Sequence, residues 1–117
     1  MISIENSNGT ITVSSEVFTM IAGDAATSCF GVKGMAGRVK EGGIYQLLRR
    51  DSMSRGVDVK FNDDNTASIG LHIIVENGVN LPAVCSSIKK EVYYKVTEAT
   101  GMAVKNVDIF VDGMVIS

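Results

Sequence analysis

The fold is decided by the stretch Val75-Glu76-Asn77-Gly78-Val79-Asn80-Leu81-Pro82, which joins a long strand to a long helix. Asn77-Gly78 supplies the turn after the strand. Asn80 is the predicted helix N-cap, because its side chain can accept a hydrogen bond from a free N–H of the first turn. Pro82 falls inside that turn, where the N–H that proline lacks would have no partner. Nothing in this junction could carry out a reaction.

Outward from this junction, the residue pattern predicts a one-sided β-hairpin before it and a helix and a strand after it. Residues 57–61 and 66–76 alternate apolar and polar side chains, as half-buried strands do, around a turn at Asp63-Asp64-Asn65. Residues 81–100 carry a single apolar stripe at helical spacing. Residues 103–111 are predicted to form the last strand, which is followed by a turn at Gly113.

The first half of the chain predicts a short hairpin, two helices and a loop. Residues 2–13 hold two apolar-alternating pairs around a central turn, and Ser14 can cap the helix that follows. This helix is expected to end at Phe30-Gly31. The five glycines within residues 31–43 predict an irregular, mobile loop, and residues 44–50 are expected to form a short helix.

These elements run in the order β-α-(short α)-β-β-α-β along a single domain, residues 1–117. With strands that are apolar on one face and two helices to cover that face, the fold class is α+β. The expected architecture is a two-layer sandwich whose mainly antiparallel sheet is covered by two helices. The hydrophobic content of 45% is ordinary for a globular protein.

The net charge of −2 hides a basic segment. Residues 33–60 hold seven basic and three acidic residues, a balance of +4, whereas the rest of the chain has a balance of −6. Such a segment could meet an anionic partner, for example a nucleic acid, an anionic lipid or an acidic protein face. The alternative is a solvated loop and helix whose charges keep the protein soluble.

The candidate partner-binding loop lies within this segment and consists of Gly31, Lys33, Gly34, Arg38 and Lys40. Residues 31–34 of this loop, Gly-Val-Lys-Gly, fit the G-x-x-G pattern with which KH domains clamp four nucleotides. The two glycines would let the backbone approach a phosphate, with Lys33 pointing at it. The alternative is a flexible connection between two helices.

No catalytic, cofactor or metal site is predicted. His72, the only histidine, has no cysteine or second histidine at zinc-ligand spacing, and the chain has no nucleophile frame of the G-x-S-x-G kind. A hydrogen-bonded surface histidine is therefore favoured. The turn at residues 63–65 lacks the register of a calcium loop. Cys29 and Cys85 are predicted to be reduced thiols on inward helix faces of a cytosolic protein.

Ile74 and Phe110 are the candidate self-association residues. Both are expected on strand faces opposite the core, and on neighbouring strands they would form an exposed apolar patch of the kind that marks protein interfaces. Tyr93 and Tyr94 lie off the apolar stripe of the second helix. A homo-oligomer is therefore expected.

Several segments occur in the same order in the alkaline shock protein family, small stress-associated proteins of Gram-positive bacteria. They are Gly9-x-Ile11 before Ser15-Glu16-Val17, Gly31-Val32-x-Gly34-Met35, Val75-Glu76-x-Gly78-x-Asn80-x-Pro82, and Thr100-Gly101 followed by Val104 and Val107. The chain resembles this family over roughly residues 3–115. It departs from the family at Asn77, where tyrosine is common, and at residues 27–30, which replace the usual acidic or small residues.

The resemblance implies a non-enzymatic, cytoplasmic scaffold or adaptor that is linked to alkaline or cell-envelope stress. Some members of the family self-associate and lie beneath the membrane through a separate, membrane-anchored protein partner. The family has no established catalytic residues. No apolar run of this chain approaches the ~20 residues of a transmembrane helix, and no signal peptide is visible. The alternative function is a KH-like nucleic-acid-binding domain that uses residues 31–34.

Overall fold

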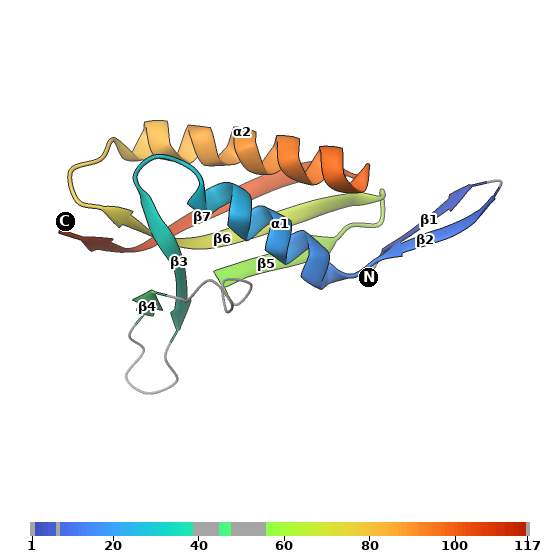
Figure 1. The fold of residues 1–117 in the computed structure, drawn as a ribbon, viewed down its shortest axis with the longest axis horizontal. Coiled ribbons are helices and arrows are strands. Elements are labelled where there is room, and N and C mark those ends of the chain that lie inside the picture. The colour runs from blue at the N-terminus through green and yellow to red at the C-terminus, as the bar shows by residue number, and fades with distance from the viewer. Residues whose placement is uncertain (1, 7, 39–44, 48–55, 117) are drawn as a thin grey trace.

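Two helices lie on one face of a mixed β-sheet in the computed structural model, which describes residues 2–6, 8–38, 45–47 and 56–116 (Figure 1). The two-layer α+β architecture expected from the sequence is confirmed. In chain order the elements are β1 (Ile2–Asn6), β2 (Gly9–Val13), α1 (Ser15–Thr27), β3 (Val32–Arg38), β4 (Tyr45–Leu47), β5 (Val57–Phe61), β6 (Thr66–Glu76), α2 (Leu81–Thr100) and β7 (Ala103–Val115).

β6 is the central strand, because it pairs with three others. β3 and β5 pair antiparallel with successive stretches of one edge of β6, and β7 pairs parallel with the whole of the other edge. Parallel neighbours need a crossover, and α2 supplies it by carrying the chain over the sheet from β6 to β7. β1 and β2 form a separate hairpin that projects from the two layers (Figure 1).

The junction between β6 and α2 has the predicted geometry. The Asn80 side chain accepts a hydrogen bond from the backbone N–H of Ala83 at 3.2 Å, and the helix ends at Gly101, whose φ is +75°. Four valine and isoleucine residues of α2 at helical spacing are buried against the sheet: Val84, Ile88, Val92 and Val96. The long strand and the long helix are therefore fixed by local sequence, as predicted.

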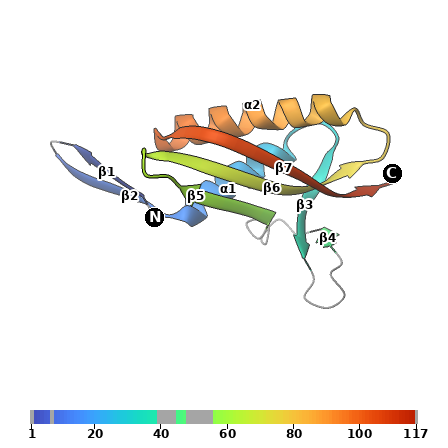
Figure 2. The same ribbon diagram turned by 180° about the vertical axis from the view of Figure 1, so that it is seen from behind.

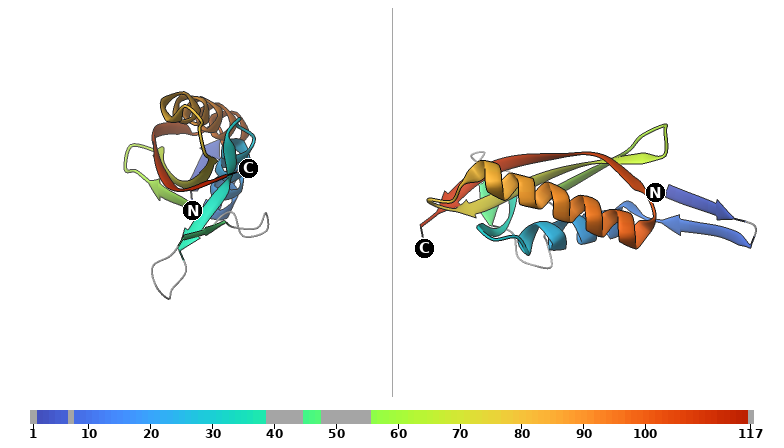
Figure 3. Two further views of the ribbon diagram at one scale, coloured as in Figure 1. Left: turned by 90° about the vertical axis from the view of Figure 1, so that its left-hand side faces the viewer. Right: turned by 90° about the horizontal axis from the view of Figure 1, so that it is seen from above.

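The core lies between the helices and the sheet (Figure 3). The inward residues of β6 are those predicted, and all are buried: Ala67, Ile69, Leu71, Ile73 and Val75. Phe18 of α1 meets Phe61 of β5 edge to face, with ring centroids 5.2 Å apart. The patch of small residues in α1, including Ala22 and Ala26, is also buried, and α1 packs against α2 as its low bulk suggested.

Two predictions for the middle of the chain are wrong. Residues 32–38 of the expected loop form strand β3, since pairing with the end of β6 supplies backbone partners that outweigh the local preference of glycine. Tyr45–Leu47 of the expected short helix forms strand β4, which pairs with β3. The remaining residues of the predicted loop and helix, 39–44 and 48–50, lie outside the described residues.

Smaller differences concern the ends of elements. α1 ends at Thr27 rather than at residue 30, and Ser14 stands at its N-cap without a side-chain capping bond. The last strand continues through Gly113 to Val115, because β6 stays paired with it to Glu76. The pairing shifts in register near Gly113 instead of ending there.

Candidate functional site

The sheet has one side that α1 and α2 do not cover, formed by β5, β6 and β7 (Figure 2). We call this side the outer face. Its side chains come from alternate positions of the three strands, as the pleat requires. They are Asp58, Lys60, Ser68, Gly70, His72, Asn106, Asp108, Phe110 and Asp112.

His72 lies at the centre of the outer face and connects all three strands. Its Nδ1 is 2.8 Å from Oδ2 of Asp112 on β7, and its Nε2 is 3.5 Å from Oδ2 of Asp58 on β5. The imidazole also stacks on the ring of Phe110, with centroids 4.7 Å apart and an angle of 14° between the planes. The prediction of a hydrogen-bonded histidine on the polar side of its strand is confirmed.

The surroundings of His72 decide what chemistry the cluster can perform. A histidine that activates a nucleophile needs a carboxylate on one nitrogen and a hydroxyl or thiol on the other. Here Asp112 occupies the first position, but the second nitrogen faces the carboxylate of Asp58. When the imidazole is protonated, both N–H groups are directed at carboxylates, so the arrangement orders the face.

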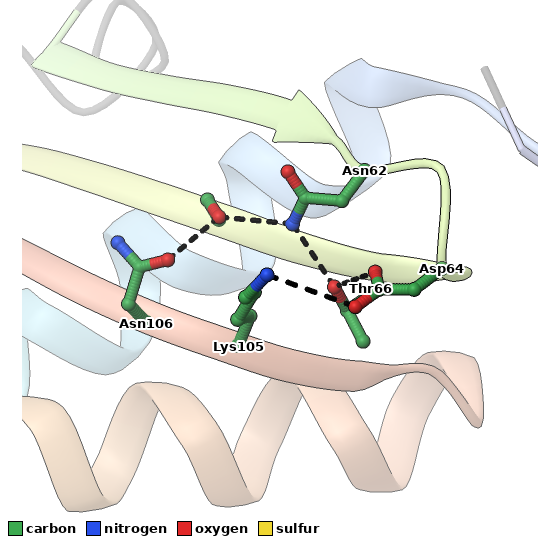
Figure 4. A network of polar contacts seen from close by, with 6 residues as sticks. Asn62, Asp64, Thr66, Lys105 and Asn106 are labelled. Carbon is green, nitrogen blue, oxygen red and sulfur yellow. Dashed lines mark hydrogen bonds and ion pairs between the residues drawn. The ribbon is translucent and has the colours of Figure 1, made fainter.

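A second polar network lies on the same side of the sheet, near the turn between β5 and β6 (Figure 4). Asn62 donates hydrogen bonds to Thr66 and Ser68 at 2.9 and 3.0 Å, and Ser68 donates to Asn106 on β7 at 2.7 Å. The network ties the hairpin turn to β7. The predicted turn at residues 63–65 is therefore reinforced by the side chain of Asn62, which precedes it, and by side chains of β6 and β7.

Asp64 is held at the edge of this network. Thr66 donates a hydrogen bond to Oδ1 of Asp64 at 2.6 Å, and Lys105 Nζ lies 3.7 Å from Oδ2. The hydrogen bond from Thr66, and after it the charge of Lys105, lower the pKa of the Asp64 carboxyl below its usual range. Within the described ranges, no three His, Cys, Asp or Glu side chains are grouped so that they could hold a metal ion.

Between these two clusters the outer face has a shallow hollow above Gly70. Gly70 is paired with Asp58 on one side and with Asp108 on the other, so two carboxylate-bearing positions flank it. The hollow exists because Gly70 has no side chain: a Cβ there would lie 3.7 Å from the ring of Phe110. Lys60 and Ser68 complete the lining.

The predicted partner-binding loop does not have the geometry of a nucleotide clamp. Gly31 lies in the turn after α1, while Lys33 and Gly34 are part of β3, where Gly34 is buried and pairs with Ile74. A G-x-x-G clamp needs exposed backbone between two helices, whereas residues 32–34 lie in a strand, and the part of these residues in binding a partner stays a prediction. Lys33 is exposed and Arg38 ends β3, whereas Lys40 lies outside the described residues.

The two candidate self-association residues lie on neighbouring strands, as expected, but they differ in exposure. Phe110 is 48% exposed, whereas Ile74 is only 6% exposed. The register partners of Ile74 are Gly34 on β3 and Gly113 on β7, so missing side chains on both sides leave room for it. The expected apolar patch therefore consists of Phe110 without Ile74. Their part in self-association stays a prediction.

A second exposed surface lies on the solvent side of α2. Lys89 and Lys90 are followed one turn later by Tyr93 and Tyr94, and all four side chains are exposed. The sequence marked the tyrosines as lying off the apolar stripe, but the lysines one turn earlier were missed. The i,i+4 spacing was the signal that could have found them.

The outer face and the solvent side of α2 define a class of protein: a small α+β domain whose ordered polar clusters give no sign of catalytic activity. A family model matches residues 3–116, and the chain belongs to that family, the alkaline shock protein 23 family, described as having a cell envelope-related function. No solved structure gives a significant match.

Two relatives cover almost the same length. The uncharacterized protein YloU of Bacillus subtilis is 36% identical over 115 residues, which are 97% of this chain and 94% of the relative. The uncharacterized protein Spy1614 of Streptococcus pyogenes is 28% identical over 97% of this chain and 93% of the relative. In the described part of the chain, no helix is long and apolar enough to cross a membrane.

Proposed function

We propose that this protein is a non-catalytic, cytoplasmic scaffold or adaptor of the cell envelope, which acts through self-association and through contacts with protein partners. The observation that carries this proposal is the outer face itself. Phe110 is half exposed, and its ring stacks on the imidazole of His72, which two aspartates contact in turn. Exposed aromatics on ordered surfaces are typical centres of protein interfaces.

Membership of the family supports the link to the envelope, because its description gives a cell envelope-related function. We infer that the protein is associated with alkaline or envelope stress and reaches the membrane through a membrane-anchored partner. Nucleic-acid binding is the alternative, and its geometric basis, a G-x-x-G loop between helices, is replaced by strand β3.

The test combines self-association with partner recovery from the native host. Sedimentation velocity should give species larger than the monomer, and Phe110→Asp should shift them towards the monomer. After mild cross-linking, the tagged protein should be recovered with a membrane protein from the membrane fraction, and the Phe110→Asp variant should lose that partner.

A nucleic-acid binder would give a different set of results. Freshly purified protein would have a raised ratio of absorbance at 260 to 280 nm and would bind RNA with an affinity that falls steeply with salt. Neutralising Lys33, Arg38 and Lys40 would then weaken RNA binding. The proposal expects the same triple variant to leave the oligomer unchanged, so a monomer that binds RNA tightly would refute it.

A further inference from the structure

Two surfaces on opposite sides of the described domain carry exposed aromatics among charges of opposite sign. One is the outer face of the sheet. The other we call the helix face, and it consists of Lys89, Lys90, Tyr93 and Tyr94 on α2. α2 lies on the inner side of the sheet (Figure 3), and these four residues are on its exposed side, so the helix face and the outer face look in opposite directions.

The outer face is acidic around its hollow. Asp58 and Asp108 flank Gly70, and the Asp58 side chain is 80% exposed. Phe110 forms the wall of this hollow beside His72. Lys60 lies at the rim, so the hollow combines two carboxylates, one ammonium and the exposed part of an aromatic ring.

The helix face is basic. The two lysines and the two tyrosines are neighbours one turn apart, and both tyrosines are about half exposed. Within the described residues neither lysine forms an ion pair. The other charged residues near the end of α2 are Glu91, Lys95 and Glu98. A hydrogen bond to Glu98 and the charges of Glu98 and Glu91 raise the pKa of the Tyr94 hydroxyl, so both carboxylates border the helix face on the Tyr94 side, away from Lys89.

We propose that the outer face of one copy of this protein receives the helix face of a second copy. Lysine ammonium groups would enter the hollow beside Asp58 and Asp108, where Phe110 offers a ring face to a cation. This inference rests on the proposed function and names the surfaces through which self-association takes place. The inference is argued from the opposite charges of two uncovered faces of the same chain.

The charges also decide the symmetry of the contact. Outer face against outer face would bring Asp58 and Asp108 towards the same aspartates of the partner, and helix face against helix face would oppose lysines. Like charges in contact repel each other, so a twofold contact through either face is disfavoured. A contact between the two different faces is heterologous and leaves one free face of each kind at the ends, so copies add in rows unless a ring closes.

Two charge-reversed variants test this pairing. The sheet-face variant is Asp58→Lys/Asp108→Lys, and the helix-face variant is Lys89→Glu/Lys90→Glu. Each alone should associate on the order of 100-fold more weakly than the wild type, because like charges now meet across the contact. Mixed in equal amounts, they should associate again. The helix face of the sheet-face variant then meets the unchanged outer face of the helix-face variant, and the two reversed faces, one basic and one acidic, also carry opposite charges.

Matched controls reverse charges outside the two faces. Asp63→Lys, in the exposed turn beyond β5, and Lys95→Glu, on the other flank of α2, should leave the sedimentation profile unchanged. If the sheet-face variant does not fold by circular dichroism, Asp108→Lys alone replaces it, because Asp108 does not contact His72. Raising the salt concentration should weaken the wild-type contact.

The outcomes separate this inference from the proposed function. A wild type that stays monomeric would refute self-association and with it both proposals. An oligomer that survives both variants, or variants that remain monomers when mixed, would overturn the pairing of faces while leaving self-association through another surface intact. Association in the mixture, with monomers in each variant alone, supports the pairing.

Discussion

Gly31 and Gly78 form a matched pair for testing whether close packing requires a glycine at the turn between α1 and β3. Both have positive φ angles, +88° and +92°, so alanine at either position is strained in the backbone. Their surroundings differ. A Cβ at Gly31 would lie 3.0 Å from Cγ1 of Val79 and 3.2 Å from Cγ2 of Val84, whereas a Cβ at Gly78 would have no atom within 4 Å.

The expected loss of stability follows from these two contributions. The left-handed backbone costs an alanine about 1–2 kcal/mol, and this cost applies to both positions. Forcing a methyl group into a packed site adds about 1–3 kcal/mol, and this cost applies at Gly31 alone. We therefore expect Gly31→Ala to lower the free energy of unfolding by about 2–5 kcal/mol and Gly78→Ala by about 1–2 kcal/mol.

Urea unfolding followed by circular dichroism measures both values, at equal protein concentration because association shifts the midpoint. Val79→Ala removes the closest atom, so in the Gly31→Ala background it should recover most of the packing cost, with a coupling of about 1 kcal/mol or more. Equal losses at the two glycines, or no coupling with Val79, would refute a packing role for Gly31. If Gly31→Ala abolished RNA binding without exceeding the loss of Gly78→Ala, the nucleotide clamp would be restored.

Three further outcomes are expected. Ile74→Asp should destabilise the fold by about 3–5 kcal/mol, because it buries an unpaired charge, whereas Phe110→Asp should unfold at nearly the urea concentration of the monomeric wild type; similar midpoints for the two variants would contradict the difference in exposure. Asn80→Ala should cost about 1 kcal/mol through the lost N-cap, and a neutral result would mean that the cap contributes nothing. Burial and, less strongly, a nearby glutamate raise the pKa of the Cys29 thiol. Cys29 should therefore be alkylated more slowly than Cys85, and its alkylation rate should still increase at alkaline pH where the rate of an ordinary thiol has become constant. Equal alkylation rates of the two cysteines in the folded protein would contradict this.

The second half of the fold could be predicted because its signals are local. The strand at 66–76 shows its inward face by simple alternation, and the helix at 81–100 has a cap, a proline in its first turn and a terminal glycine. Each of these signals acts within a few residues of the place where it is read. The boundaries of both elements therefore agree with the structure to the residue.

The segment after α1 could not be predicted in the same way, because long-range pairing decides it. Glycines at 31, 34 and 37 suggest a loop when only local preference is considered. In the structure, Gly34 and Gly37 are buried in β3, and Met35 between them is fully buried in the core. The pairing that holds β3 is with residues 73–75, about forty positions away, and no local pattern announces it.

The outer face shows the same limit at the level of a site. Alternation placed His72 and Phe110 on polar sides of their strands, but it could not say which residues would be neighbours, since that depends on the register of β7 against β6. The register brings Phe110 beside His72 and then shifts between residues 111 and 113, so that Asp112 has no direct partner on β6. Asp112 is thereby free to turn its carboxylate to His72, which leaves the Asp112 side chain only 11% exposed. A one-residue change in that register would send Asp112 to the other side of the sheet. The irregularity near the end of β7 therefore decides whether Asp112 can hold the imidazole that stacks on Phe110.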